Sequence, residues 1–69
     1  MMITELIARR TRALTTEQIL GALEHLEPTD PREEARMVRA ALMDTLEGRE
    51  PNHPVVQAEI ARLNAEYDA

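Results

Sequence analysis

The segment that most constrains this chain runs from Asp30 to Gly48, DPREEARMVRAALMDTLEG, because it carries signals for both ends of one helix. Asp30 is a favourable N-cap residue, and Pro31 suits the first helical position, where a missing N–H is harmless. Glu33, three residues after the cap, completes a capping-box pattern. Gly48 fits the left-handed residue that closes many helices. The sequence therefore predicts a helix over residues of about 31–47, the longest in the chain.

One face of this helix is apolar. Its small and apolar residues recur at spacings of three and four, and they are Ala35, Val38, Leu42 and Thr45, with Ala41 and Leu46 beside them. Such spacing is typical of a helix that places one side against a core and the other in water. Pro51 follows soon afterwards and prevents the helix from resuming.

Two shorter helices are expected before this one. The first covers residues of about 3–13, and the second begins after Thr15 or Thr16, where Thr15 and Gln18 form another capping-box pair. Gly21 lies inside the second helix at a cost of roughly 1 kcal/mol relative to Ala, so it is either a weak point or a place where another backbone comes close. The expected apolar sides are Ile3, Leu6, Ile7 and Leu14 for the first helix, and Ile19, Leu20, Leu23 and Leu26 for the second.

A fourth helix is expected at the C-terminal end of the chain. Asn52 or His53 is its N-cap, and Pro54 begins it. Its apolar residues follow one another at spacings of four, three and four, and they are Val56, Ile60, Leu63 and Tyr67. This is the narrow seam of a coiled coil, so the helix is expected to pack against one partner helix.

Taken together, the segments predict an all-α fold, a small bundle of three or four helices that forms a single domain over residues 1–69. A chain of 69 residues buries only about 60% of its unfolded surface. The sequence has one aromatic residue and no cysteine, so it lacks the disulfides that stabilise many small domains. Packing between two copies is the remaining source of stability, and we expect a homodimer.

Composition also limits the environment and the partners. The sequence has no cysteine, no apolar run of transmembrane length and no secretory signal, which favours a cytoplasmic protein without a membrane partner. Its net charge of −5 opposes binding to a phosphate backbone, so we expect no nucleic-acid partner. The same charge favours solubility and leaves a basic protein partner open.

Two pairs of carboxylates raise the alternative of an enzyme. Glu24 with Glu27, and Glu47 with Glu50, share a Glu-x-x-Glu spacing similar to that of all-helical nucleotide pyrophosphohydrolases, where such pairs hold Mg²⁺. Gly48 interrupts the second pair, and isolated carboxylates are normally solvated. We therefore expect neither a metal nor another cofactor, and no enzymatic activity, with Mg²⁺-dependent nucleotide hydrolysis as the alternative.

Other side chains suggest weaker possibilities. Arg9, Arg10 and Arg12 crowd the end of the first helix, which leaves a small DNA-binding regulator as a further alternative. The two histidines, His25 and His53, are separated by 28 positions and have no cysteine nearby, so they do not form a zinc-binding pattern.

The preferred hypothesis is a non-enzymatic helical module for protein–protein interaction, such as a small regulator or a phage-type modulator of a host protein. Arg32, Arg36 and Arg39 lie within a narrow arc of the central helix and could hold an acidic partner. Met37 and Met43 lie outside its apolar face, where exposed methionines can form an adaptable binding surface. These five residues are the predicted partner-binding site.

The run MVRAALMDTLEGREP, residues 37–51, resembles a segment of uncharacterised short helical proteins from actinobacteria and their phages and plasmids. In those proteins an apolar helix is followed by an acidic-Leu-Glu-x-Arg stretch and a proline. The resemblance covers about a fifth of the chain and implies a bacterial or phage origin, without implying an activity.

Overall fold

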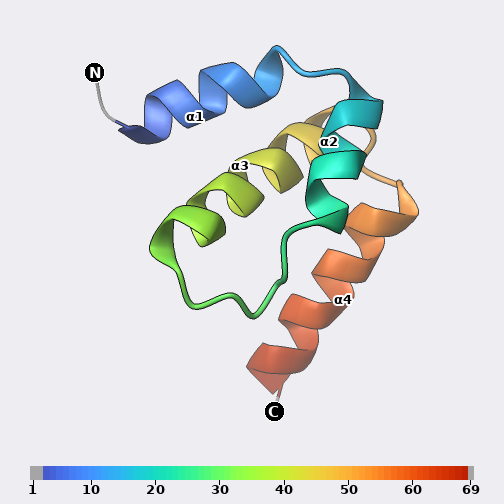
Figure 1. Ribbon diagram of the computed structural model, residues 1–69. Helices are drawn as coiled ribbons and strands as arrows, with labels where there is room; N and C mark the ends of the chain where they lie inside the picture. The colour runs from blue at the N-terminus through green and yellow to red at the C-terminus, as the bar shows by residue number, and fades with distance from the viewer. Residues whose placement is uncertain (1–2, 69) are drawn as a thin grey trace.

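The computed structural model describes residues 3–68, with the side chains of Thr4 and Asp68 excepted, and these residues form four helices and no strand. The helices are α1 (Ile3–Arg12), α2 (Thr16–Glu24), α3 (Glu33–Arg49) and α4 (Pro54–Asp68) (Figure 1). The predicted all-α bundle is confirmed, and α3 is its longest helix at 17 residues.

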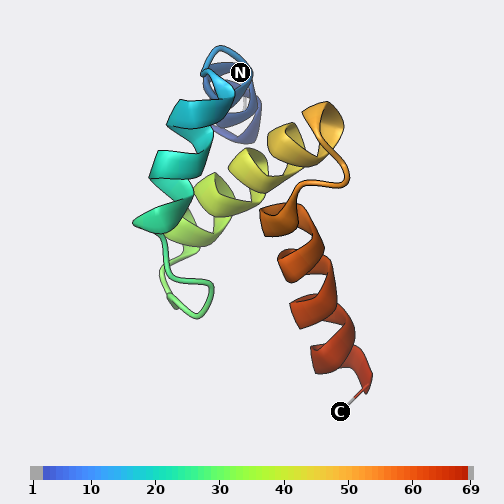
Figure 2. The ribbon, with the colours of Figure 1, turned by 90° about the vertical axis from the view of Figure 1, so that its right-hand side faces the viewer.

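Helix α3 lies at the centre of the molecule, and the other three helices pack against it. Helix α1 runs beside α3 in roughly the same direction, so that Thr11 meets Thr45 and Arg12 meets Arg49. Helix α4 begins against α3 and then extends away, so its C-terminal half stands clear of the other helices (Figure 2). The centre of the bundle is therefore well covered, while much of α4 is not.

The core is small. Its buried apolar side chains are Ile19, Leu42, Met43, Leu46 and Val56. The predicted apolar faces of α2 and α3 supply Ile19, Leu42 and Leu46. The premise that Met43 is exposed is wrong, because its side chain is only 7% exposed. The start of α4 covers that side of α3, so the buried face is wider than the sequence pattern indicates.

The beginning of α3 differs from the prediction. The helix starts at Glu33 with Arg32 as its N-cap, and no side chain caps it. Asp30 instead accepts a hydrogen bond from the backbone N–H of Arg32 at 2.9 Å, which forms a local turn around Pro31. Arg32 takes an extended conformation, with φ −67° and ψ 128°, so the chain enters the helix two residues later than predicted.

The end of α3 also differs. Gly48 is helical with a negative φ, so it is not the predicted left-handed closing residue. The helix continues to Arg49, and the N–H of Glu50 still donates to the carbonyl of Leu46 at 2.8 Å. Glu50 precedes Pro51 and takes an extended φ of −139°. The proline therefore ends the helix through its effect on Glu50.

The N-termini of α2 and α4 agree with the predictions. Thr15 caps α2, where the backbone N–H of Gln18 donates to the Thr15 hydroxyl at 3.1 Å and the Gln18 side chain accepts from the Thr15 N–H at 2.9 Å. His53 lies just before α4, and its Nδ1 accepts from the N–H of Val55 at 3.1 Å. In both cases a side chain satisfies an N–H group that the helix leaves free.

The predicted apolar side of the first helix is only partly covered, since Leu14 packs against the core and Ile7 is half-buried. Thr11 is buried, whereas Ile3 is 67% exposed and Leu6 is 37% exposed. The Thr11 hydroxyl lies 2.9 Å from the carbonyl of Ala8 and 3.2 Å from the Thr45 hydroxyl on α3. Small residues at this contact let the two helices approach closely, and the hydroxyl pair sets their register. Ile3 and Leu6 therefore remain at the surface.

Candidate functional site

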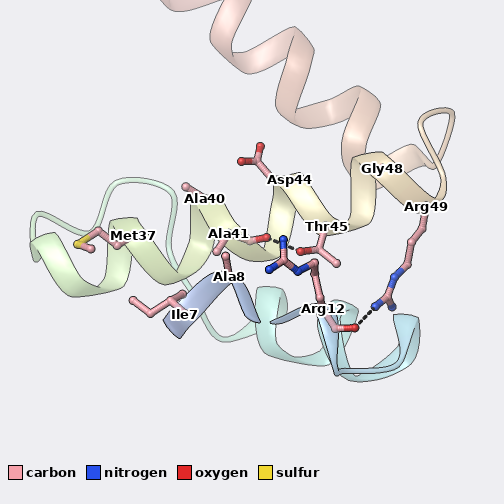
Figure 3. A pocket seen from close by; sticks show the side chains of 10 residues that line it. All are labelled: Ile7, Ala8, Arg12, Met37, Ala40, Ala41, Asp44, Thr45, Gly48 and Arg49. Atoms are coloured by element: carbon pink, nitrogen blue, oxygen red, sulfur yellow. Dashed lines mark hydrogen bonds between the residues drawn. The ribbon is translucent and has the colours of Figure 1, made fainter. Parts of the chain in front are cut away.

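An open groove of about 590 Å³ lies between α1 and α3 (Figure 3). We call it the first groove. It is lined by Ile7, Ala8, Arg12, Met37, Ala40, Ala41, Asp44, Thr45, Gly48 and Arg49. Its lining is predominantly apolar, with small side chains in the middle. The groove can therefore accommodate an apolar side chain of another molecule.

The two ends of the first groove differ in chemistry. Ile7 and Met37 lie at one end and Arg49 lies at the other, while the Arg12 side chain points back toward Ala41 and Thr45 in the middle (Figure 3). The Arg49 guanidinium donates to the carbonyl of Arg12 at 2.9 Å, which ties the end of α3 to the end of α1. The groove can therefore receive an apolar group at one end and an acidic group at the other.

A second groove of about 320 Å³ lies between α3 and α4. It shares Ala40 and Asp44 with the first groove, so the two adjoin along the exposed side of α3. Ile60 and Leu63 of α4 line it, and each is 38% exposed. We call the two grooves together the outer surface of α3. This surface has apolar side chains from three helices and an exposed alanine in its middle.

An ion-pair network holds α4 beside the second groove. Arg39 donates to Glu59 through two nitrogens, with Nη1–Oε2 at 2.6 Å and Nη2–Oε1 at 3.1 Å. Arg62 also pairs with Glu59 at 3.0 Å. The hydrogen bonds from Arg39 are the main cause that lowers the pKa of Glu59 below its ordinary value, against the opposing effect of burial. Glu59 is therefore a fixed negative charge between two helices.

The five predicted partner-binding residues do not form one surface. Arg39 is engaged with Glu59 and its side chain is only 15% exposed, which leaves it little freedom to bind a partner. Met43 is in the core. Met37 faces the first groove, and Arg36 lines the second. Only Met37 and Arg36 therefore lie where a partner could contact them on the outer surface of α3.

The fifth residue, Arg32, is exposed but is held by a neighbour. Its guanidinium pairs with the carboxylate of Asp30 at 2.7 Å. Hydrogen bonds from the side chain and backbone of Arg32 lower the pKa of Asp30 to about 2. This local pair stabilises the turn before α3 and lies outside the two grooves.

The two Glu-x-x-Glu pairs are not brought together. Glu24 and Glu27 line a third groove, between α2 and α4, whereas Glu47 lines the second groove. Glu50 follows the end of α3 and is exposed. Within residues 3–68, no three His, Cys, Asp or Glu side chains are grouped so that they could hold a metal ion. The arrangement offers no geometric support for the hydrolase alternative.

The arginines at the end of α1 lie beside a fourth arginine, Arg49, which the sequence did not predict to be there. Arg9, Arg10 and Arg12 are exposed, and the packing of α1 on α3 places Arg49 beside Arg12. Ala40 was also missed as a site residue. Neither could be found from the sequence, because both depend on how helices that are distant along the chain pack together.

No helix among the described residues is both long enough and apolar enough to cross a membrane. Comparisons with models of known protein families, with curated proteins and with solved structures give no match. The resemblance of residues 37–51 to short actinobacterial and phage proteins therefore stays a prediction. What this chain binds has to be inferred from the grooves along α3 and from the side chains that line them.

Proposed function

We propose that this protein is a non-enzymatic interaction module that binds an amphipathic helix of another protein on the outer surface of α3. The observation that carries the proposal is the pair of adjoining grooves, which share Ala40 and are bordered by accessible apolar side chains of α1 and α4. Grooves of this kind are used to bind the apolar face of a helix. Exposed apolar surface that is concave and rimmed by charge commonly marks an interaction site.

The lining also suggests the chemistry of the partner. Ile7 and Met37 offer an apolar seat in the first groove, and Ile60 and Leu63 offer another in the second. A helix with apolar residues three or four positions apart can reach into such seats from one face. Met37 is well suited to this role because its flexible side chain adapts to different partners.

Charged side chains at the rim would orient the partner. Arg12 lines the first groove, Arg36 lines the second, and Asp44 lines both. None of the carboxylates whose side chains the structure describes forms an ion pair with Arg36. Rim charges contribute more to orientation and association rate than to affinity. We infer a partner helix with acidic residues beside its apolar face.

The small size and acidity of the chain suit a cytoplasmic regulator that acts by occupying a surface of a larger protein, in a bacterial or phage setting. Hydrolysis through the Glu pairs and binding of DNA through the α1 arginines are not proposed. The two Glu pairs do not line one cavity, because Glu24 and Glu27 line the third groove whereas Glu47 lines the second. The net charge of −5 disfavours binding to DNA.

The test compares two matched substitutions, Ala40→Glu and Ala61→Glu. Both alanines are exposed on helices, and glutamate is a good helix former, so both variants should fold. Ala40 lies on the outer surface of α3, whereas Ala61 lies on α4 and lines neither groove. Each variant and the unmodified chain are immobilised and used to capture proteins from a bacterial lysate, with mass spectrometry as the readout.

The proposal expects at least one protein that is captured by the unmodified chain and by Ala61→Glu but is lost with Ala40→Glu. Titration calorimetry with that purified protein should then show at least a tenfold weaker affinity for Ala40→Glu, which corresponds to about 1.4 kcal/mol. Equal capture by all three proteins would contradict the proposal. So would capture by the unmodified chain that does not exceed an empty resin.

A further inference from the structure

Helix α4 is held against the rest of the chain mainly through its first turns. Of the predicted coiled-coil seam, only Val56 is fully buried, at 1% exposed, whereas Ile60 and Leu63 are each 38% exposed. Val55 is partly buried and packs against the same core. The C-terminal half of the helix stands clear of α1, α2 and α3 (Figure 2). The docking of α4 therefore depends on how well its N-terminal turn is formed.

This first turn is completed by a histidine side chain. Pro54 has no N–H, so the N–H of Val55 is the first donor that α4 leaves without a partner inside the helix. The Nδ1 of His53 accepts from this N–H at 3.1 Å, and the carbonyl of His53 accepts from the N–H of Gln57 at 3.0 Å. Nδ1 can accept only when it carries no proton, so the cap requires the neutral ring with its hydrogen on Nε2.

The charged groups that face His53 determine what a proton on its ring would meet. His53 lines the third groove together with Arg39 of α3 and with Glu24 and Glu27, which come from α2 and the loop after it. Glu50 accepts from the backbone N–H of His53 at 3.0 Å through its carbonyl, while its side chain is exposed. None of the carboxylates whose side chains the structure describes forms an ion pair with His53. A protonated ring would therefore gain no ion pair to replace the lost cap.

We propose that His53 is a proton-sensitive cap that couples the docking of α4 to pH. Histidine is the side chain that ordinarily changes its charge between about pH 5 and pH 8. Once the ring is protonated, Nδ1 is a donor, so it can no longer accept from the N–H of Val55. The positive ring also lies at the N-terminus of α4, where the helix dipole disfavours a cation. Both effects weaken the first turn of α4 as the pH falls.

The sign of the effect follows from which form of the ring the fold uses. The folded chain holds the neutral ring through a hydrogen bond that the unfolded chain lacks, so the cap stabilises the fold while the ring is neutral. That contribution is lost as the ring gains its proton. Glu24 and Glu27 oppose this loss, because carboxylates in the same groove favour the charged ring, whereas Arg39 adds to it.

Loss of the cap would affect more than the first turn. Val55 and Val56 follow the cap directly and are the α4 residues that pack in the core. Val56 also lines the second groove, so a loosened α4 changes the shape of that groove. The inference does not rest on the proposed partner site, because the cap and the docking of α4 are measured in this protein alone.

The experiment is urea unfolding, followed by circular dichroism from about pH 5 to about pH 8, of the unmodified chain, His53→Asn and His53→Ala. Asparagine is a favourable N-cap residue whose side chain does not titrate, whereas alanine cannot cap. Relative to the unmodified chain, His53→Asn should gain stability as the pH falls, with the ratio of the two unfolding constants changing roughly fivefold. His53→Ala should have a roughly fivefold larger unfolding constant than the unmodified chain at the upper pH and no larger one at the lower pH.

His25→Asn is the matched control, since His25 is the other histidine of the chain and is exposed at the end of α2. It should show no gain in stability at the lower pH, because a cation at the C-terminus of a helix is favourable. The inference is overturned if His53→Asn shows no gain at the lower pH, or if His25→Asn shows that gain instead.

NMR spectroscopy of the unmodified chain gives a direct readout that needs no variant. The amide proton signal of Val55 should move upfield together with the titration of the His53 ring signals, because its hydrogen bond is lost as the ring gains a proton. A Val55 signal that stays in place while the His53 ring titrates also overturns the inference. Neither measurement involves a partner protein, so capture in the earlier test can succeed or fail independently of these outcomes.

Discussion

At the scale of single residues, Glu59 has the clearest structural role. Its side chain is 12% exposed and accepts hydrogen bonds from Arg39 on α3 and from Arg62 on its own helix. The Nε of Arg39 is buried and has no hydrogen-bond partner within the described residues, so the pair is not fully satisfied. Such a pair contributes modestly to stability, because desolvation offsets much of its attraction. Its main effect is to fix how α4 lies against α3.

The lowered pKa of Glu59 predicts a specific dependence of stability on pH. A carboxyl group whose pKa is lower in the folded than in the unfolded chain stabilises the fold fully above its ordinary pKa of 4.5. That contribution is lost as the pH falls through the lower, folded pKa. Glu59→Gln should therefore be less stable by about 1–3 kcal/mol at pH 7, with a smaller difference from the unmodified chain at low pH.

Urea unfolding followed by circular dichroism between pH 2 and pH 7 measures this difference. Asp30, whose pKa is lowered to about 2, titrates in both proteins and cancels from the comparison. Glu24→Gln is the control, since Glu24 is exposed and forms no ion pair with any described residue. If the stability curves of Glu59→Gln and the unmodified chain run parallel over this range, the carboxylate does not have the role assigned to it.

At the scale of the elements, the helices differ in how strongly their own sequences favour helix formation. Helix α2 has a complete capping box, but it contains Gly21. The φ of Gly21 is not positive, and a Cβ added there would meet nothing within 4 Å. The alternative that another backbone approaches Gly21 within this chain is therefore wrong. The glycine is a local weak point of α2, because it gains nothing from its conformational freedom.

Gly21→Ala should raise the free energy of unfolding by about 0.5–1 kcal/mol, because alanine loses less backbone entropy in a helix. Urea unfolding of the monomer at low concentration is the measurement. Ala58→Gly on the exposed surface of α4 should lower the free energy of unfolding by a similar amount. Its measured cost gives the size of the alanine–glycine difference in an exposed helix of this protein. A destabilised Gly21→Ala would contradict this account, because it would mean that a Cβ at position 21 does not fit in the folded chain.

At the scale of the whole molecule, a small core supports four helices. Five apolar side chains form the buried cluster. Typical stabilities per residue give roughly 3–10 kcal/mol for a chain of 69 residues. The loss of one large core side chain is therefore comparable with the whole stability of the monomer. The exposed part of α4 contributes little to the monomer, since only its first turns reach the core.

Leu46→Ala and Leu63→Ala test this distribution. Leu46 is fully buried, so its truncation should cost about 2–5 kcal/mol and unfold much of the population. Leu63 is 38% exposed, so the same substitution should cost less than about 1 kcal/mol. Urea unfolding of the two variants and of the unmodified chain measures both costs. Equal costs would show that Leu63 is covered in the isolated chain.

The sequence by itself determined the elements of this protein. It predicted three or four helices, a cap at Thr15 or Thr16, and the core positions Ile19, Leu42 and Leu46. These features depend on residues that are close along the chain, through periodicity, capping and the conformational limits of proline. Even the two errors at the ends of α3 arose within a few residues of Pro31 and Pro51, where two local signals competed.

Only the tertiary structure decided which surfaces are available. It buried Met43, engaged Arg39 with Glu59, and packed α1 through Thr11 while leaving Ile3 at the surface. Each of these outcomes requires the relative position of helices that loops separate in the chain. A helical pattern states which side of a helix is apolar, but it does not state which neighbour covers that side. The grooves along α3 exist only because α1 and α4 dock on either side of it.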